Sequence, residues 1–252
     1  MLTEVAGYAG LTQPQFLICS AAIFCAGLVR GFSGFGLSAI LMAGIVVLIP
    51  PVELIPLCYL LEAAASIALF RGNLRSADWK MVWTLAITSA IGVPIGLAIT
   101  TNVPTEHSKT IALGLVLVLT FGQLFKFIPP GFGGRAGLPV AGLLAGIVTG
   151  LASVGGLVVA LYVLSRRTEA HVMRSSLIIF LFIGIFTTLA SLLSYDLMSQ
   201  ETLQRGVIFV PIVLSGVFFG TRLFSPALAP HYKKVCLLLL VCLSIVGLIR
   251  LF

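Results

Sequence analysis

Long apolar runs alternate with short polar or Pro/Gly-rich breaks along the whole chain. A helix needs about 20 consecutive apolar residues to cross the hydrocarbon core of a bilayer, and several of the runs reach that length. The pattern predicts ten helical segments, at residues 16–29, 37–49, 52–70, 81–100, 109–128, 138–151, 157–164, 172–194, 207–224 and 232–252.

The composition decides what surrounds these helices. Only 9% of the 252 residues are charged, and the mean hydropathy is +1.16, whereas soluble domains carry about 25% charged residues. A soluble fold of this chain would expose far more apolar surface than water tolerates. The sequence therefore predicts an all-α integral membrane protein.

The second half of the chain repeats the first. The stretch AGLVRG at 26–31 returns as AGIVTG at 145–150, the pair Gly92 and Gly96 corresponds to Gly216 and Gly220, and Pro104 to Pro230. We therefore expect one repeat at 1–128, a connecting loop at 129–137 and a second repeat at 138–252. With about five segments each, an odd number, the two units enter the membrane from opposite sides, which is the inverted-repeat plan of many secondary transporters.

Basic residues divide unevenly between the two sides of the predicted membrane. One side holds Lys109, Arg205 and Arg250, and the other holds Arg71, Arg75, Lys80, Lys126, Arg135, Arg166, Arg167, Arg174, Arg222, Lys233 and Lys234. The positive-inside rule makes the richer side cytoplasmic and places both termini outside. Because these residues are scattered singly through the loops, the net charge of +7 does not indicate a nucleic-acid partner.

Four segments look too short to span the membrane. The runs at 16–29, 37–49, 138–151 and 157–164 contain roughly 8 to 14 good apolar residues, or about 12–21 Å at 1.5 Å per residue, against a core of about 30 Å. Each adjacent pair is therefore expected to form a short or re-entrant hairpin with a Gly-rich tip near mid-depth. Ten tilted full spans are the alternative.

The two Gly-rich breaks, at 30–36 and 149–156, are the candidate binding site. A helix that restarts inside the membrane points free N–H groups and a positive dipole end into a protein-lined cavity, and glycine allows a ligand to approach the backbone closely. This chemistry favours a small anion, although the same glycines also suit close helix packing. The candidate substrate-binding residues are Arg30, Ser33, Gly34, Gly36, Thr149, Ser153, Gly155 and Gly156.

Two charged residues lie at positions that call for a partner. Arg30 comes about 15 residues into the first segment, and Glu62 lies in the middle of the third. Charges buried in a membrane are paired or neutralised. A deep Arg30 would pair with an anionic substrate or with Glu62, whereas in ten full spans it would be a cytoplasmic-end residue. Glu62 is either the structural partner of Arg30 or a proton-coupling group.

No enzymatic or cofactor site is expected. The histidines have no carboxylates at metal-ligand spacing, and the glycine runs match neither a phosphate-binding loop nor a dinucleotide fold. All five cysteines lie in apolar stretches and are expected to serve packing. The segment before the first apolar run contains Glu4 and no basic residue, which argues against a cleaved signal peptide.

The ordered motifs along the chain are the basis for a resemblance. They are Gly27-x-x-x-Gly31-Phe32-x-Gly34-Phe35-Gly36, Pro50-Pro51 followed by an apolar run with Glu62, Asp78-Trp79, Gly92-x-Pro94-x-Gly96, and Ala145-Gly146-x-x-x-Gly150 through Gly155-Gly156. Over nearly its whole length the chain resembles the TauE/SafE family of sulfite and organosulfonate exporters. It departs from the family at Leu157 and Val158, where members often carry prolines.

The resemblance implies a multi-pass protein of the bacterial inner membrane that moves sulfite, sulfoacetate or a related sulfur compound, with the two Gly-rich tips forming the anion site. We expect a secondary transporter that works by alternating access, without a cofactor. An anion channel and a membrane subunit of a larger transport assembly are the alternatives. The expected partners are the small anion and membrane lipid. A homodimer and a coupling ion, either a proton or sodium, are left open.

Overall fold

The computed structural model describes residues 6–127, 132, 136–165, 169–223 and 229–249, and all the regular structure within these ranges is helical. After a single helical turn at residues 6–8, the helices are α2 (Gln13–Ser33), α3 (Leu37–Ile45), α4 (Pro51–Phe70), α5 (Trp79–Asn102), α6 (Thr105–Leu124), α7 (Gly137–Ala152), α8 (Gly155–Ser165), α9 (Ala170–Ser194), α10 (Gln200–Leu223) and α11 (Ala229–Ile249).

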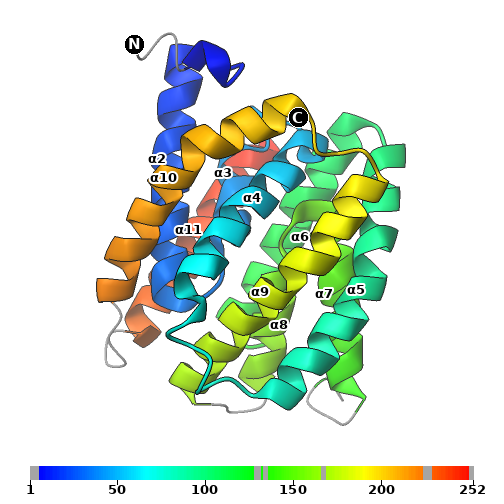
Figure 1. Ribbon diagram of the computed structural model, residues 1–252, viewed down its shortest axis with the longest axis vertical. Helices are drawn as coiled ribbons and strands as arrows, with labels where there is room; N and C mark the ends of the chain where they lie inside the picture. The colour runs from blue at the N-terminus through cyan, green and yellow to red at the C-terminus, as the bar shows by residue number, and fades with distance from the viewer. Residues whose placement is uncertain (1–5, 128–131, 133–135, 166–168, 224–228, 250–252) are drawn as a thin grey trace.

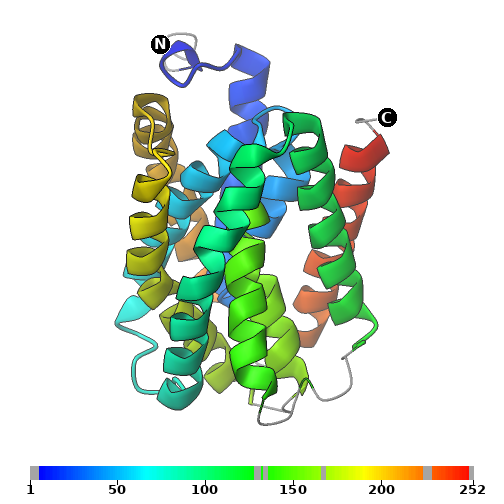
Figure 2. The same cartoon turned by 90° about the vertical axis from the view of Figure 1, so that its right-hand side faces the viewer.

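The helices run along the long axis of one bundle, and both ends of the chain lie at its upper end (Figures 1 and 2). Helices α2, α4, α5, α6, α9 and α10 are long and apolar enough to cross a bilayer. Together with the composition, they make the chain a multi-pass membrane protein. The nine-residue α3, the eleven-residue α8 and the sixteen-residue α7 fall short of the roughly 20 residues that a span requires, so the chain does not form ten full spans.

The prediction of a short first segment at 16–29 was wrong. Helix α2 has 21 residues because it begins in polar sequence and continues past the apolar run. At its start the Gln15 side chain accepts a hydrogen bond from the Thr12 N–H at 2.9 Å. The N–H groups at the start of a helix have no backbone acceptor within the helix, and this side chain provides one. At its end the helix includes Arg30, whose charge is paired within the protein.

Two helix pairs turn back inside the bundle, and they do so from opposite ends (Figure 1). Helix α2 descends from the upper end, and α3 returns towards the start of α4. Helix α7 rises from the lower end, and α8 returns towards the start of α9. The two breaks therefore overlap in the interior, where α3 and α7 make contact with each other and with α4.

Glycines set how closely the long helices pack. The most extensive helix contacts are those of α2 with α10 and of α5 with α7. A side chain at Gly27 or Gly31 would meet the backbone of α10, and one at Gly92 or Gly96 would meet the backbone of α7. Without a hydrophobic driving force between helices in lipid, such small residues provide the close van der Waals contact that holds them together.

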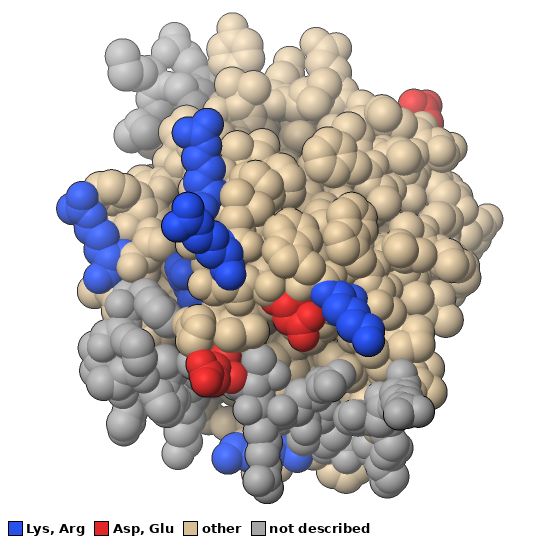
Figure 3. Space-filling model, turned by 60° about the horizontal axis from the view of Figure 1, so that its bottom comes forward, with Lys and Arg blue, Asp and Glu red and all other residues tan. Residues whose placement is uncertain are grey.

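The lower end of the bundle is rich in exposed basic side chains (Figure 3). Those that the structure describes are Arg71, Arg75, Lys80, Lys126 and Arg222, all from the side that the sequence predicted to be cytoplasmic. The sequence placed Arg205 in a loop on the side that is poorer in basic residues, and the assignment to a loop was wrong. It lies within α10, is only 5% exposed, and donates hydrogen bonds to Glu53, Glu201 and the Ala9 carbonyl. Three carbonyl or carboxylate acceptors explain why this arginine is buried.

The glycine contacts predict a position-specific loss of stability. In Gly96→Ala the new methyl group would meet the backbone of Ile147 and Gly150, so α5 and α7 must separate. Overpacking of this kind destabilises by about 1–3 kcal/mol, which corresponds to roughly 2–10 °C in the melting temperature of detergent-purified protein for a chain of this size.

Gly114→Ala is the matched control, because nothing lies within 4 Å of the position of its added methyl group. Since alanine is the better helix former by roughly 0.5–1 kcal/mol, this variant is expected to melt at or slightly above the wild-type temperature. Equal melting temperatures for the two variants would show that the α5–α7 contact does not depend on glycine.

Candidate functional site

The break between α2 and α3 is made by two glycines in left-handed backbone conformations, Gly34 (φ 82°) and Gly36 (φ 93°). The Gly34 N–H still bonds to the Arg30 carbonyl at 2.9 Å and closes α2. The Val29 and Phe35 carbonyls lie 2.8 and 2.7 Å from the Ser33 hydroxyl, which can donate to either of them, and this fixes the turn. Helix α3 then restarts, and the N–H groups of its first turn have no acceptor within the helix, as in every helix.

The break between α7 and α8 uses a serine. Ser153 has a φ of 57°, and its N–H closes α7 on the Thr149 carbonyl at 2.7 Å. Two residues later α8 begins at Gly155. A side chain at Gly155 would meet the Ala145 backbone and the Thr149 hydroxyl, so this glycine allows α8 to fold back closely against α7.

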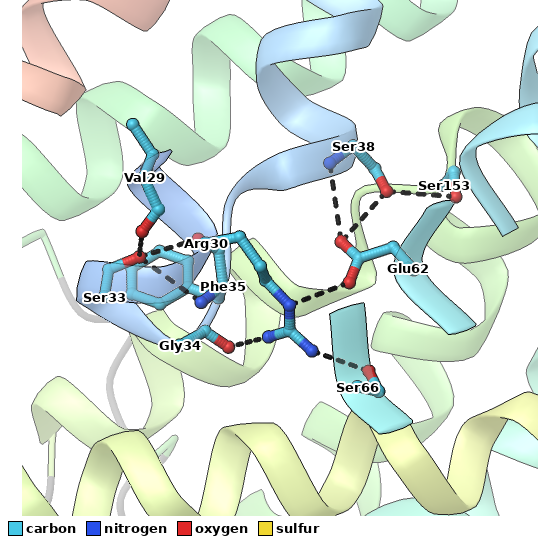
Figure 4. Close-up of polar contacts among 9 residues, drawn as sticks. All are labelled: Val29, Arg30, Ser33, Gly34, Phe35, Ser38, Glu62, Ser66 and Ser153. Carbon is cyan, nitrogen blue, oxygen red and sulfur yellow. Dashed lines mark hydrogen bonds and ion pairs between the residues drawn. The ribbon is translucent and has the colours of Figure 1, made fainter. Parts of the chain in front are cut away.

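A cavity of about 60 Å³ lies between the two breaks, at the level of the middle of α4. The Ser38 and Ser153 hydroxyls, one from each hairpin, lie 3.5 Å apart (Figure 4). Most of the remaining surface is small or hydroxyl-bearing, with apolar residues from α9. The lining residues are Gly36, Ser38, Ala39, Tyr59, Glu62, Ala63, Ser89, Thr149, Ser153, Val154, Gly156, Leu157, Phe180, Leu181, Gly184, Ile185 and Thr188.

Arg30 is fully buried; its Nε contacts Glu62 as an ion pair, and both Nη atoms donate hydrogen bonds (Figure 4). Its Nε lies 3.0 Å from the Glu62 Oε2 atom, one Nη donates to the Ser66 hydroxyl at 2.7 Å, and the other donates to the Gly34 carbonyl. A charge at this depth must be compensated. The structure compensates it with an ion pair that ties the end of α2 to α4.

Glu62 connects this ion pair to the cavity. While its Oε2 faces Arg30, its Oε1 accepts a hydrogen bond from the Ser38 hydroxyl at 3.1 Å and one from the Ser38 N–H at 3.4 Å. The Ser38 N–H belongs to the first turn of α3, where a helix attracts negative charge. The carboxylate of Glu62 therefore occupies the position at the α3 N-terminus that suits an anion.

A second arginine holds the first break from the side of α9. Arg174 donates from Nε to the Phe32 carbonyl at 3.0 Å and from Nη2 to the Gly31 carbonyl at 2.6 Å. These carbonyls belong to the last turn of α2, which attracts cations. The sequence indicated only that Arg174 belongs to the cytoplasmic side. Its contact with α2 could not be inferred from spacing, because Arg174 and Gly31 are about 140 positions apart in the chain.

The predicted binding residues fall into three groups in the structure. Gly36, Thr149, Ser153 and Gly156 line the cavity. Arg30 lies behind Glu62, a residue of the cavity wall, and does not itself line the cavity. The other three, Ser33, Gly34 and Gly155, shape the two turns and do not contribute to the lining.

The predicted site left out four polar lining residues, Ser38, Tyr59, Ser89 and Thr188. Ser38 carried a usable signal, because it lies two residues after the glycine break, in the first turn of the restarted helix. Tyr59 lies one helical turn before Glu62 on α4, so the spacing to the buried carboxylate could have identified it. Ser89 reaches the cavity only through the packing of α5, which no local pattern reveals.

Within the described residues, no group of three or more His, Cys, Asp and Glu side chains is placed to hold a metal ion. The groups at or near the cavity are the N-termini of α3 and α8, several hydroxyl groups and the Arg30–Glu62 pair.

Comparison with protein families gives a match over most of the chain. The family model described as sulfite exporter TauE/SafE matches residues 19–247, which is nearly the whole chain. No curated protein and no solved structure matches significantly. Members of this family are membrane transporters and not enzymes, and the match covers both helix breaks, Arg30 and Glu62. The chain belongs to the sulfite exporter TauE/SafE family.

Proposed function

We propose that the protein is a secondary transporter that carries sulfite, sulfoacetate or a related organosulfonate across the bacterial inner membrane by alternating access. The observation that carries this proposal is the small cavity on which the N-termini of α3 and α8 converge, between two helix pairs that enter the bundle from opposite ends. Membership of the TauE/SafE family supports the sulfur anion as the substrate class.

The chemistry of the lining suits a sulfur oxyanion. The oxygens of sulfite and sulfonates accept hydrogen bonds and carry negative charge, so they pair with hydroxyl groups, with N–H groups of a first helical turn and with the positive end of a helix dipole. Ser38, Thr149 and Ser153 supply hydroxyls, and Gly36 and Gly156 let a ligand approach the backbone. A cavity of about 60 Å³ has room for only a few water molecules, so it selects small ions.

The packing of the helices supports two inverted repeats, α2–α6 and α7–α11. Helix α2 packs on α10 as α7 packs on α5, α4 packs on α10 as α9 packs on α5, and α3 packs on α11 as α8 packs on α6. Each of these three contacts therefore has a counterpart when the two repeats are exchanged. In such transporters one repeat rocks against the other around a fixed site, which opens the site to each side in turn.

Removal of one cavity hydroxyl is expected to weaken transport. In liposomes that contain the purified protein, radiolabelled sulfite uptake should exceed that of empty liposomes, and Ser38→Ala or Ser153→Ala should raise the KM about tenfold or more. A hydrogen bond to a charged group contributes about 1.5–3 kcal/mol.

Ser215→Ala is the control, because its hydroxyl is exposed on α10 and donates only to the Ile212 carbonyl. Its KM should equal that of the wild type. Uptake no faster than in empty liposomes would refute the proposed function, and an unchanged KM in both cavity variants would remove these hydroxyls from the site.

Two variants of the Arg30–Glu62 pair distinguish its contribution to protein stability from its contribution to transport. Arg30→Ala leaves a buried carboxylate without its partner, which destabilises a protein by about 3–5 kcal/mol, and we expect it to abolish sulfite uptake. The double variant Arg30→Met with Glu62→Gln removes both charges, so its melting temperature should recover while uptake remains absent, because no positive charge is left to attract the anion. Wild-type uptake by this double variant would show that Arg30 has only a structural role.

A further inference from the structure

Glu62 lies where the proposed substrate would bind. Its Oε1 accepts from the Ser38 N–H and hydroxyl at the start of α3, and its side chain, 16% exposed, forms part of the cavity wall. Among the described lining residues it is the only acidic one. The donors that suit an anion at the first break are therefore already engaged by a carboxylate of the protein itself.

An ionised Glu62 and a bound anion are incompatible in so small a space. Two negative charges about 4 Å apart weaken binding by roughly a thousandfold at the effective dielectric constant of protein sites. The cavity of about 60 Å³ does not allow a much larger separation. Arg30 cannot relieve the conflict while Glu62 is ionised, because its charge is then neutralised by the ion pair.

Few other charges bear on Glu62. Arg30 of α2 is in direct contact with it, and Arg174 of α9 binds the last carbonyls of the same helix. On α4 itself the nearest titratable groups are Cys58 and Tyr59, and α3 and α7 have none. The remaining ionisable residues on the helices that pack on α4 are Cys19 and Cys25 of α2, Lys80 of α5, Glu106, His107 and Lys109 of α6, His171 of α9, and Glu201, Arg205 and Arg222 of α10.

We propose that Glu62 is the proton-coupling site of the transporter: it takes up one proton when the anion binds and releases that proton when the anion leaves. This inference rests on the proposed function and adds to it the driving ion. A hydronium ion on the side to which the cavity is open gives the proton to a carboxylate oxygen: one O–H bond of hydronium breaks, one O–H bond of the carboxyl group forms, and a water molecule is left. Release on the other side reverses this transfer.

Protonation changes three features of the site together. The repulsion between Glu62 and the anion is removed, the Ser38 donors become available to the anion, and the charge of Arg30 is no longer neutralised. When the anion and proton leave on the other side, the Arg30–Glu62 pair forms again and the empty carrier returns. The anion and the proton therefore travel in the same direction.

Calorimetric titration with sulfoacetate tests the linkage, because its sulfonate and carboxylate groups stay ionised between about pH 6 and 9. In the purified wild type, the Kd should rise about tenfold per pH unit over the range where Glu62 of the empty protein is ionised. Binding heats in buffers of different ionisation enthalpy should report the uptake of one proton per bound anion.

Glu62→Gln should bind sulfoacetate with a Kd that is independent of pH and without proton uptake. Glu53→Gln is the matched control: Glu53 lies on the same helix and also pairs with an arginine, Arg205, but it does not line the cavity, so this variant should keep the wild-type pH dependence.

Tight sulfoacetate binding by the wild type without proton uptake would overturn the inference and leave the proposed function intact, even if Glu62→Gln does not fold. A full pH dependence in Glu62→Gln, or wild-type binding that requires sodium and takes up no proton, would also overturn it. Failure of the wild type to bind sulfoacetate and to transport sulfite would contradict the proposed function itself.

Discussion

The compensation of one buried positive charge organises the centre of this protein. Arg30 is fully buried in the last turn of the membrane-spanning helix α2, where a lone charge is expensive, and Glu62 and Ser66 of α4 together with the Gly34 carbonyl compensate it. These contacts fix the end of α2 against the middle of α4. They also place the Glu62 carboxylate at the start of α3, so the group that stabilises the fold is also the group that faces the cavity.

Close helix packing makes it possible to break two helices inside the bundle. Backbone groups freed by a break must be satisfied by protein or face a cavity. Here glycine contacts bring α10 against α2 and α5 against α7, and side chains complete the coverage: Arg174 binds the last carbonyls of α2, and the Thr100 hydroxyl donates to the Gly150 carbonyl of α7 at 2.9 Å. The remaining free groups of the two breaks then meet between the hairpins.

The sequence predicted the class of the protein, most of the helices and the location of both breaks, because apolar run length and glycine patterning are local properties. It also indicated the alternative in which Arg30 pairs with Glu62. It failed where tertiary contacts extend or bury a segment. Helix α2 continues at both ends through polar residues, and Arg205 is buried because acceptors from three separate parts of the chain surround it. The contribution of Ser89 to the cavity likewise depends on packing between distant helices.

The central claim is that a sulfur anion occupies the space between the two breaks and reaches it from both sides of the membrane. Ser153→Cys, in a chain whose native cysteines are replaced, tests this claim through the rate of reaction with a membrane-impermeant thiol reagent added to either side of oriented vesicles. We expect the introduced thiol to react with reagent added to either side, and we expect sulfoacetate to slow the reaction from both sides. Reaction from one side only, or at a rate that sulfoacetate does not change, would contradict the claim.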